Sequence, residues 1–149
     1  MMRMQQANSP DAALAAAYNA THYEVHSPDG LMVLRLDVLN PALQLVHEQL
    51  SVRCSAFLTA WNPRSVPTPA AANAAALERM RLRVAALGLV CWTGWGRDPT
   101  GQWPAEESLF VPGLDRARAG QLGRDFDQHA IVHARHDAVP RLIWLEISR

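Results

Sequence analysis

The segment CSAFLTAW, residues 54–61, constrains the fold more than any other part of the chain. It is largely apolar at both alternating positions, and successive residues of a strand face opposite sides of a sheet. A strand of this kind is stable only where both of its faces are covered. We therefore predict a central strand with protein packed on either side of the sheet.

Four helix starts are marked by a residue that can cap a helix, and in three of them a proline follows at the first helical position. The markers are Ser9-Pro10, Asn40-Pro41, Thr68-Pro69 and Asp115. They predict helices from residue 10 to about 18, over 41–50, from 69 to an end at Gly88, and from 116 to about 125.

The remaining apolar segments predict strands. HYEVH and LMVLRLDV form a hairpin around Ser27–Gly30, LVCWTGW and EESLFV are joined by a Gly/Pro-rich turn, and HAIVHAR and RLIWLEI close the chain as a final hairpin. Because hairpins alternate with helical crossovers, we predict one α+β domain over residues 10–149. It would contain a mixed β-sheet with packed helices, preceded by a flexible tail over residues 1–9.

Composition fits a single ordinary domain. The chain has 149 residues, of which 49% are hydrophobic, and its formal net charge is zero, so no overall field draws it to nucleic acid or anionic lipid. Cys54 and Cys91 lie in apolar segments and are predicted to be buried thiols. The N-terminus lacks the apolar core of a signal peptide and no segment is long enough to span a membrane, so we predict a cytoplasmic protein.

Several strings together resemble domain-of-unknown-function family 3293, a family of small bacterial proteins. They are THYEV (21–25), FLTAWNP (57–63), the Asn73 position, WPAEESLFV (103–111) and LGRDFDQHAIV (122–132). The resemblance implies a one-domain architecture over nearly the whole chain. It implies no activity, substrate or cofactor.

Asn73 is the most informative polar residue, because it falls on the apolar stripe of the longest predicted helix. Leu77, Met80 and Val84 share this stripe at helical spacing. An amide that faces the core must have its hydrogen bonds satisfied. Asn73 either ties down the preceding loop, around residues 62–65, or lines a cleft and contacts a ligand.

The loop before this helix and two later positions supply the other candidates. Asn62 and Arg64 lie between the end of the central strand and a helix N-terminus, where an anion could bind. Glu106 and Glu107 face opposite sides of a predicted strand, so one carboxylate could point inward, and Glu107 is a weak candidate for a catalytic acid or base. Gln128, near the start of another strand, could extend the same cluster.

The histidines suggest a metal site, but their spacing along the sequence does not support one. His22, Glu24 and His26 would share one face of a strand, and His129 and His133 another. Such alternation also describes a solvent-exposed face, and no compact Cys/His motif is present. We predict no metal site and no cofactor.

Three hypotheses for function remain. The first is a binding domain for a small polar or anionic ligand, with an amide-rich pocket built from Asn62, Arg64, Asn73, Glu107 and Gln128. The second is a small hydrolase or transferase acting on a nucleotide or nucleic acid, with Glu107 as general base and Arg64 on the phosphate. The third is an adaptor that contacts a partner protein through exposed tryptophans. None involves a membrane.

Overall fold

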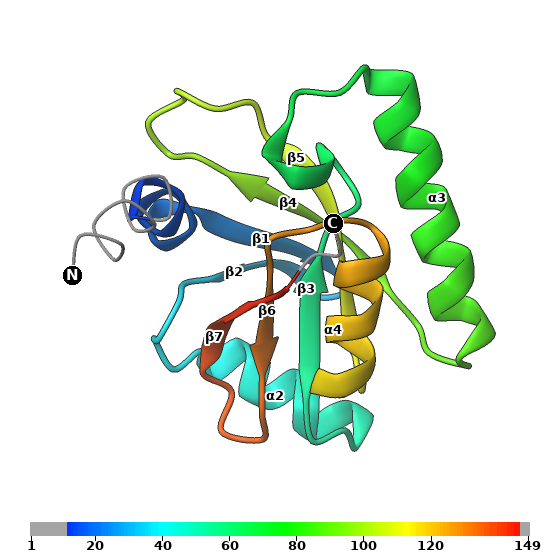
Figure 1. The fold of residues 1–149 in the computed structure, drawn as a ribbon. Helices are drawn as coiled ribbons and strands as arrows, with labels where there is room; N and C mark the ends of the chain where they lie inside the picture. Colours follow the sequence, from blue (N-terminus) through cyan, green and yellow to red (C-terminus); the bar gives the residue numbers. More distant parts are fainter. Residues whose placement is uncertain (1–11, 147–149) are drawn as a thin grey trace.

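The computed structural model describes residues 12–146, which form a single α+β domain with helices packed on a curled, seven-stranded antiparallel sheet (Figure 1). The strand order is β2-β1-β4-β5-β3-β6-β7. The strands are β1 (His22–Ser27), β2 (Gly30–Leu34), β3 (Ser55–Leu58), β4 (Trp92–Arg97), β5 (Glu106–Pro112), β6 (Ala130–Ala134) and β7 (Pro140–Trp144). The helices are α2 (Pro41–Leu50), the short 3₁₀ helix η1 (Pro63–Ser65), α3 (Ala70–Ala86) and α4 (Arg116–Asp125), preceded by an N-terminal helix that covers residues 12–20.

Strand β3 confirms the prediction of a covered central strand. It lies between β5 and β6, and all four of its residues are buried. Ala56 and Leu58 pack into a core with α3 and α4 on one face of the sheet. Phe57 points to the other face, where Leu43 of α2 and Tyr18 of the N-terminal helix cover a second core.

The pairing of the strands corrects one prediction, because every ladder among the described residues is antiparallel rather than mixed. The helical crossovers do join strands that run in the same direction, as the sequence suggested. However, α3 joins β3 to β4 with β5 between them, and α4 joins β5 to β6 with β3 between them. Residues 55–134 therefore form two interlocked split β-α-β units, the arrangement of ferredoxin-like folds.

The helix starts follow the sequence signals with one correction. The side chains of Asn40 and Asp115 cap α2 and α4 as predicted. Pro69, rather than Thr68, takes the N-cap position of α3, and the Thr68 hydroxyl donates to the carbonyl of Val66. The predicted flexible tail, with the Ser9-Pro10 signal, lies outside the described residues.

Two further predictions concern cysteines and membranes. Cys54 and Cys91, predicted to be buried, are free thiols and each is partly exposed. Within residues 12–146, none of the helices combines the length and the apolar character that crossing a bilayer requires.

Candidate functional site

The loop after β3 has an unusual backbone. Asn62, Arg64 and Ser65 all have left-handed φ angles of 47°, 58° and 61°. Non-glycine residues adopt this region at a cost in free energy, and they keep it only where surrounding contacts hold them. The loop therefore needs support from outside its own sequence.

Asn73 gives most of that support from the first turn of α3. Its Oδ1 accepts from the backbone N–H of Asn62 at 2.9 Å, and its Nδ2 donates to Asn62 Oδ1 at 3.0 Å and to the Thr68 carbonyl at 3.2 Å. Its side chain is buried. The structure thus shows Asn73 tying down the preceding loop, one of the two roles predicted for it, and every contact is within the protein.

Gln128 and Asn62 complete an amide network around the loop. Gln128 Nε2 donates to the carbonyls of Trp61 at 3.0 Å and Phe126 at 3.2 Å. Asn62 Oδ1 accepts from Thr68 N, and its Nδ2 donates to Glu106 Oε2 at 2.7 Å. Three of the predicted residues, Asn62, Asn73 and Gln128, therefore meet at this loop.

Glu107 and Arg64, the other two predicted residues, lie outside this network. Glu106, and not Glu107, is the strand carboxylate that contacts the amide network. The Glu107 carboxylate lies on the opposite face of β5, 3.9 Å from Arg81 Nη2. Arg64 is half-exposed, with Nη2 3.9 Å from Asp127 Oδ1, while its backbone N–H donates to the Asp127 carbonyl at 2.8 Å. This backbone bond ties the loop to the turn that follows α4.

Burial raises the pKa of the Glu106 carboxyl above its ordinary value of 4.5, and the hydrogen bond from Asn62 opposes this only in part. The pKa of Glu106 is therefore higher in the folded protein than in the unfolded chain. As pH rises from the unfolded pKa through the folded one, the carboxyl ionises more readily in the unfolded chain, and the fold loses stability. Glu106→Gln removes the charge but keeps an acceptor for Asn62. We expect the variant to have a larger free energy of unfolding than the wild type at pH 8, with the difference vanishing as pH falls below 4.5. Denaturant titrations at several pH values measure this, and a variant that is less stable at pH 8 would contradict it.

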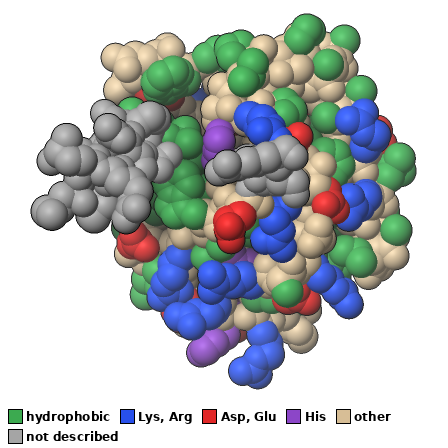
Figure 2. Space-filling view, in the orientation of Figure 1, with side chains coloured by type: hydrophobic (Ala, Val, Ile, Leu, Met, Phe, Trp, Pro, Cys, Tyr) green, Lys and Arg blue, Asp and Glu red, His purple; other side chains and the backbone are tan. Residues whose placement is uncertain are grey.

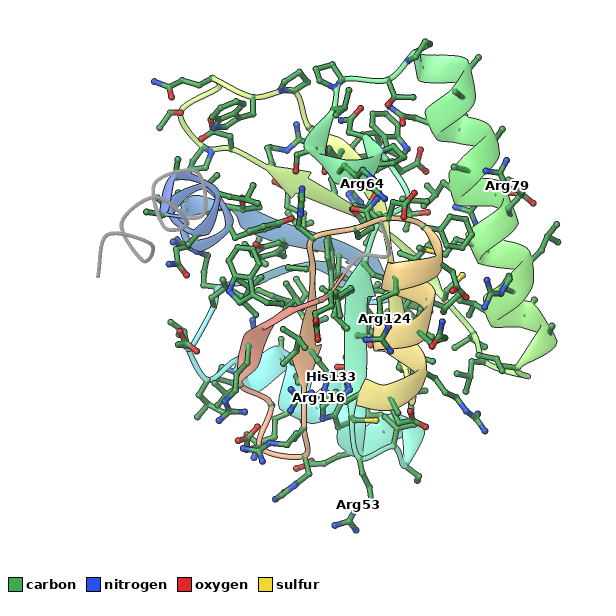
Figure 3. The ribbon with its side chains drawn as sticks, viewed as in Figure 1. Arg53, Arg64, Arg79, Arg116, Arg124 and His133 are labelled. Atoms are coloured by element: carbon green, nitrogen blue, oxygen red, sulfur yellow. The ribbon has the colours of Figure 1, made fainter. Side chains whose placement is uncertain are left out.

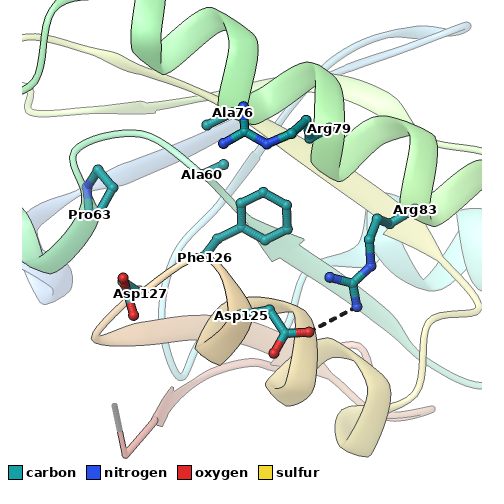
Figure 4. Close-up of a pocket in the computed structure, with 8 residues that line it drawn as sticks. All are labelled: Ala60, Pro63, Ala76, Arg79, Arg83, Asp125, Phe126 and Asp127. Atoms are coloured by element: carbon teal, nitrogen blue, oxygen red, sulfur yellow. Dashed lines mark hydrogen bonds and ion pairs between the residues drawn. The ribbon is translucent and has the colours of Figure 1, made fainter. Parts of the chain in front are cut away.

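A cavity of about 380 Å³ opens beside the loop, between α3 and the turn after α4 (Figure 4). Its volume lies at the small end of the range for ligand pockets. The residues that line it are apolar on the floor and charged on the two walls: Ala60, Pro63, Ala76 and Phe126 with Arg79, Arg83, Asp125 and Asp127.

Most arginines near the cavity have acidic partners. Over α3 and α4, blue and red side chains stand next to one another in Figure 2, and the ion pairs include Arg81–Glu78 at 2.8 Å and Arg83–Asp125 at 2.9 Å. Arg83 also lies over the Phe126 ring, 6.0 Å from its centroid. Arg79 is the exception at this cavity, since its guanidinium makes no hydrogen bond or ion pair with any residue of the described chain.

The sequence did not identify this cavity. Arg79 is absent from the candidates that the sequence supplied, and Gln128 is the only residue of the string LGRDFDQHAIV assigned to the predicted pocket. The available signal was RDFD (124–127), an aromatic residue between charges where a helix passes into a strand.

No histidine or tryptophan is among the residues that line the cavity. His22 Nε2 is 3.1 Å from Arg35 Nη1, and Glu24 binds Arg97 at 3.0 Å. No group of three His, Cys, Asp or Glu side chains within residues 12–146 is placed to hold a metal ion. Trp103 and Trp144 are exposed, in the β4–β5 loop and at the end of β7.

Comparison with known proteins gave one match. The model of a family described as "Protein of unknown function (DUF3293)" matches residues 58–131. This segment runs from the end of β3 into β6 and contains all eight residues that line the cavity, together with the amide network. None of the curated proteins and none of the solved structures matches the chain.

Proposed function

We propose that this chain, which belongs to the DUF3293 family, binds a small anionic ligand in the cavity between α3 and the turn after α4. The observation that carries the proposal is Arg79, an arginine without an acidic partner among the described residues, at the wall of a cavity with an apolar floor. A guanidinium offers paired N–H donors that match a carboxylate or phosphate. The apolar floor would bury the rest of a small molecule.

The amide network supports this proposal by fixing the walls. Gln128 holds the Trp61 carbonyl, and the Arg64 N–H holds the Asp127 carbonyl, so the loop and the turn on either side of the cavity are joined directly. A site that is already formed loses less entropy when its ligand binds. We therefore assign Asn62, Asn73 and Gln128 the role of positioning the cavity walls rather than touching the ligand.

Catalysis by Glu107 and Arg64 receives less support from the geometry. That hypothesis requires the two side chains to act on one substrate, whereas Glu107 lies beside Arg81 and Arg64 lies beside Asp127. We further propose that the protein acts in the cytoplasm, where its two free, partly exposed thiols would stay reduced.

Methyl NMR of alanine-labelled protein tests the binding proposal, with 3-phenylpropionate as the anionic probe. We expect the probe to shift the methyl signals of Ala60 and Ala76, which line the cavity, and to leave Ala138, in the β6–β7 turn, unchanged. Arg79→Gln should weaken the fitted affinity about tenfold, because one charge-assisted hydrogen-bonded contact is lost.

Arg53→Gln is the matched control. Arg53 is also exposed and also lacks an acidic partner in the described part of the chain, but it lies at the far end of the molecule from Arg79 (Figure 3). It should bind the probe like the wild type. Equal loss in both variants, or no shift at Ala60 and Ala76, would refute the proposal.

A further inference from the structure

The two walls of the cavity carry opposite charges. The α3 wall contributes Arg79 and Arg83, and the opposite wall contributes Asp125, at the end of α4, and Asp127, in the turn that follows (Figure 4). The formal charges of the four side chains cancel. A ligand that carried only negative charge would meet attraction on one wall and repulsion on the other.

On each wall, one charged side chain is already paired within the protein. Arg83 and Asp125 bind each other at 2.9 Å. This leaves Arg79 on one side and Asp127 on the other. Asp127 lies 3.9 Å from Arg64, but both side chains are about half-exposed, at 45% and 49%, and an exposed pair at this distance contributes little. Its carboxylate therefore remains able to bind a second cation.

Asp127 is also firmly positioned. Its φ of 55° is left-handed, a region that Asp and Asn tolerate better than most residues. Its backbone N–H donates to the Arg124 carbonyl at 3.0 Å, and its own carbonyl accepts from Arg64 N at 2.8 Å. The side chain thus starts from a fixed point on the cavity wall.

The surface between the two charges is apolar. Ala60, Ala76 and the Phe126 ring form the floor, and Phe126 lies between α3 and the turn in Figure 4. A ligand that reached from Arg79 toward Asp127 would rest its uncharged part on the partly exposed Phe126 ring, since Ala60 and Ala76 are buried beneath the surface.

We infer that the ligand is a small zwitterion of the free amino acid class, with its acid on Arg79, its amine on Asp127 and an apolar side chain on the cavity floor. This inference rests on the proposed function and narrows it. It adds that the acidic wall contributes to affinity rather than only to the shape of the site.

Three probes that differ by one group each separate the contributions. L-Phenylalanine carries both charges, 3-phenylpropionate lacks the amine, and 2-phenylethylamine lacks the acid. We expect phenylalanine to bind about tenfold more tightly than 3-phenylpropionate, the increment for one charge-assisted contact. The amine should bind most weakly. Alanine methyl shifts at Ala60 and Ala76 give the affinities.

Asp127→Asn is the decisive variant, because asparagine tolerates the left-handed backbone and keeps the carbonyl bond to Arg64. It should lower the affinity for phenylalanine about tenfold and leave that for 3-phenylpropionate unchanged or improved. Asp37→Asn is the matched control, since Asp37 is an exposed aspartate with φ of 64° that does not line the cavity, and it should change neither affinity.

The outcomes separate the inference from the function beneath it. If 3-phenylpropionate binds through Arg79 but phenylalanine binds no better, or if Asp127→Asn affects both equally, the zwitterion is wrong and the anion site stands. If neither acid shifts Ala60 and Ala76, both proposals fail.

Discussion

Replacing Gly94 by alanine is expected to lower the free energy of unfolding by about 3 kcal/mol, at the upper end for overpacking a core. A Cβ at this position would lie 2.7 Å from Cε2 of Phe57 and 2.9 Å from the backbone oxygen of Glu24. The Phe57 ring is buried and packs edge-to-face on Tyr23 with centroids 5.2 Å apart. Neither it nor the β1 backbone can move away without breaking these contacts.

Gly96→Ala provides the control within the same strand. Residues 94 and 96 face the same side of β4, but a Cβ at Gly96 would meet nothing closer than 3.8 Å. We expect this change to shift stability by less than about 0.5 kcal/mol. Urea denaturation of both variants measures the difference. Similar midpoints for the two would show that the close approach of Phe57 to residue 94 does not destabilise the alanine variant.

Asn73→Ala is expected to cost about 3 kcal/mol as well, for a different reason. It removes three hydrogen bonds and leaves the Asn62 N–H and the Thr68 carbonyl without their partner. Each such bond contributes about 1 kcal/mol, and a buried group left unpaired adds to the loss. The left-handed residues of the loop would lose their main support at the same time.

The exposed Glu78, on the same helix, offers a control for this second experiment. Glu78→Ala breaks only an exposed pair with Arg81 and should cost less than about 0.5 kcal/mol. Thermal denaturation followed by circular dichroism compares the two. An Asn73→Ala protein as stable as Glu78→Ala would mean that the loop holds its backbone without the amide.

The sequence could predict those parts of the fold that depend only on residues close to one another in the chain. Asn40 and Asp115 cap their helices with their own side chains, so the starts of α2 and α4 follow from neighbouring residues alone. The covered strand β3 was also evident, because its composition reports burial on both faces. Strand order was beyond reach, since it depends on β5 and β6 pairing with β3 from positions roughly 50 and 75 residues later.

The site was predictable in part for similar reasons. Asn73 stood out because an amide on an apolar helical stripe needs partners. Alternation placed Glu106 and Glu107 on opposite faces, but which one meets Asn62 depends on where that loop packs. The cavity brings Ala60 next to Phe126, and no pattern within either segment reports that contact. Arg79 becomes a candidate ligand-binding residue only because this contact between segments distant in sequence forms a cavity beside it.

The placement of β3 has a consequence for how the protein is made. During synthesis this apolar strand leaves the ribosome long before Glu106–Pro112 and Ala130–Ala134, the segments that flank it in the finished sheet. Until then its two edges offer unpaired N–H and C=O groups to any neighbouring nascent chain. Pairing of β3 on both edges must therefore wait until residues 106–134 have been synthesised, and shielding by a chaperone should raise the yield of native protein more than slower translation does.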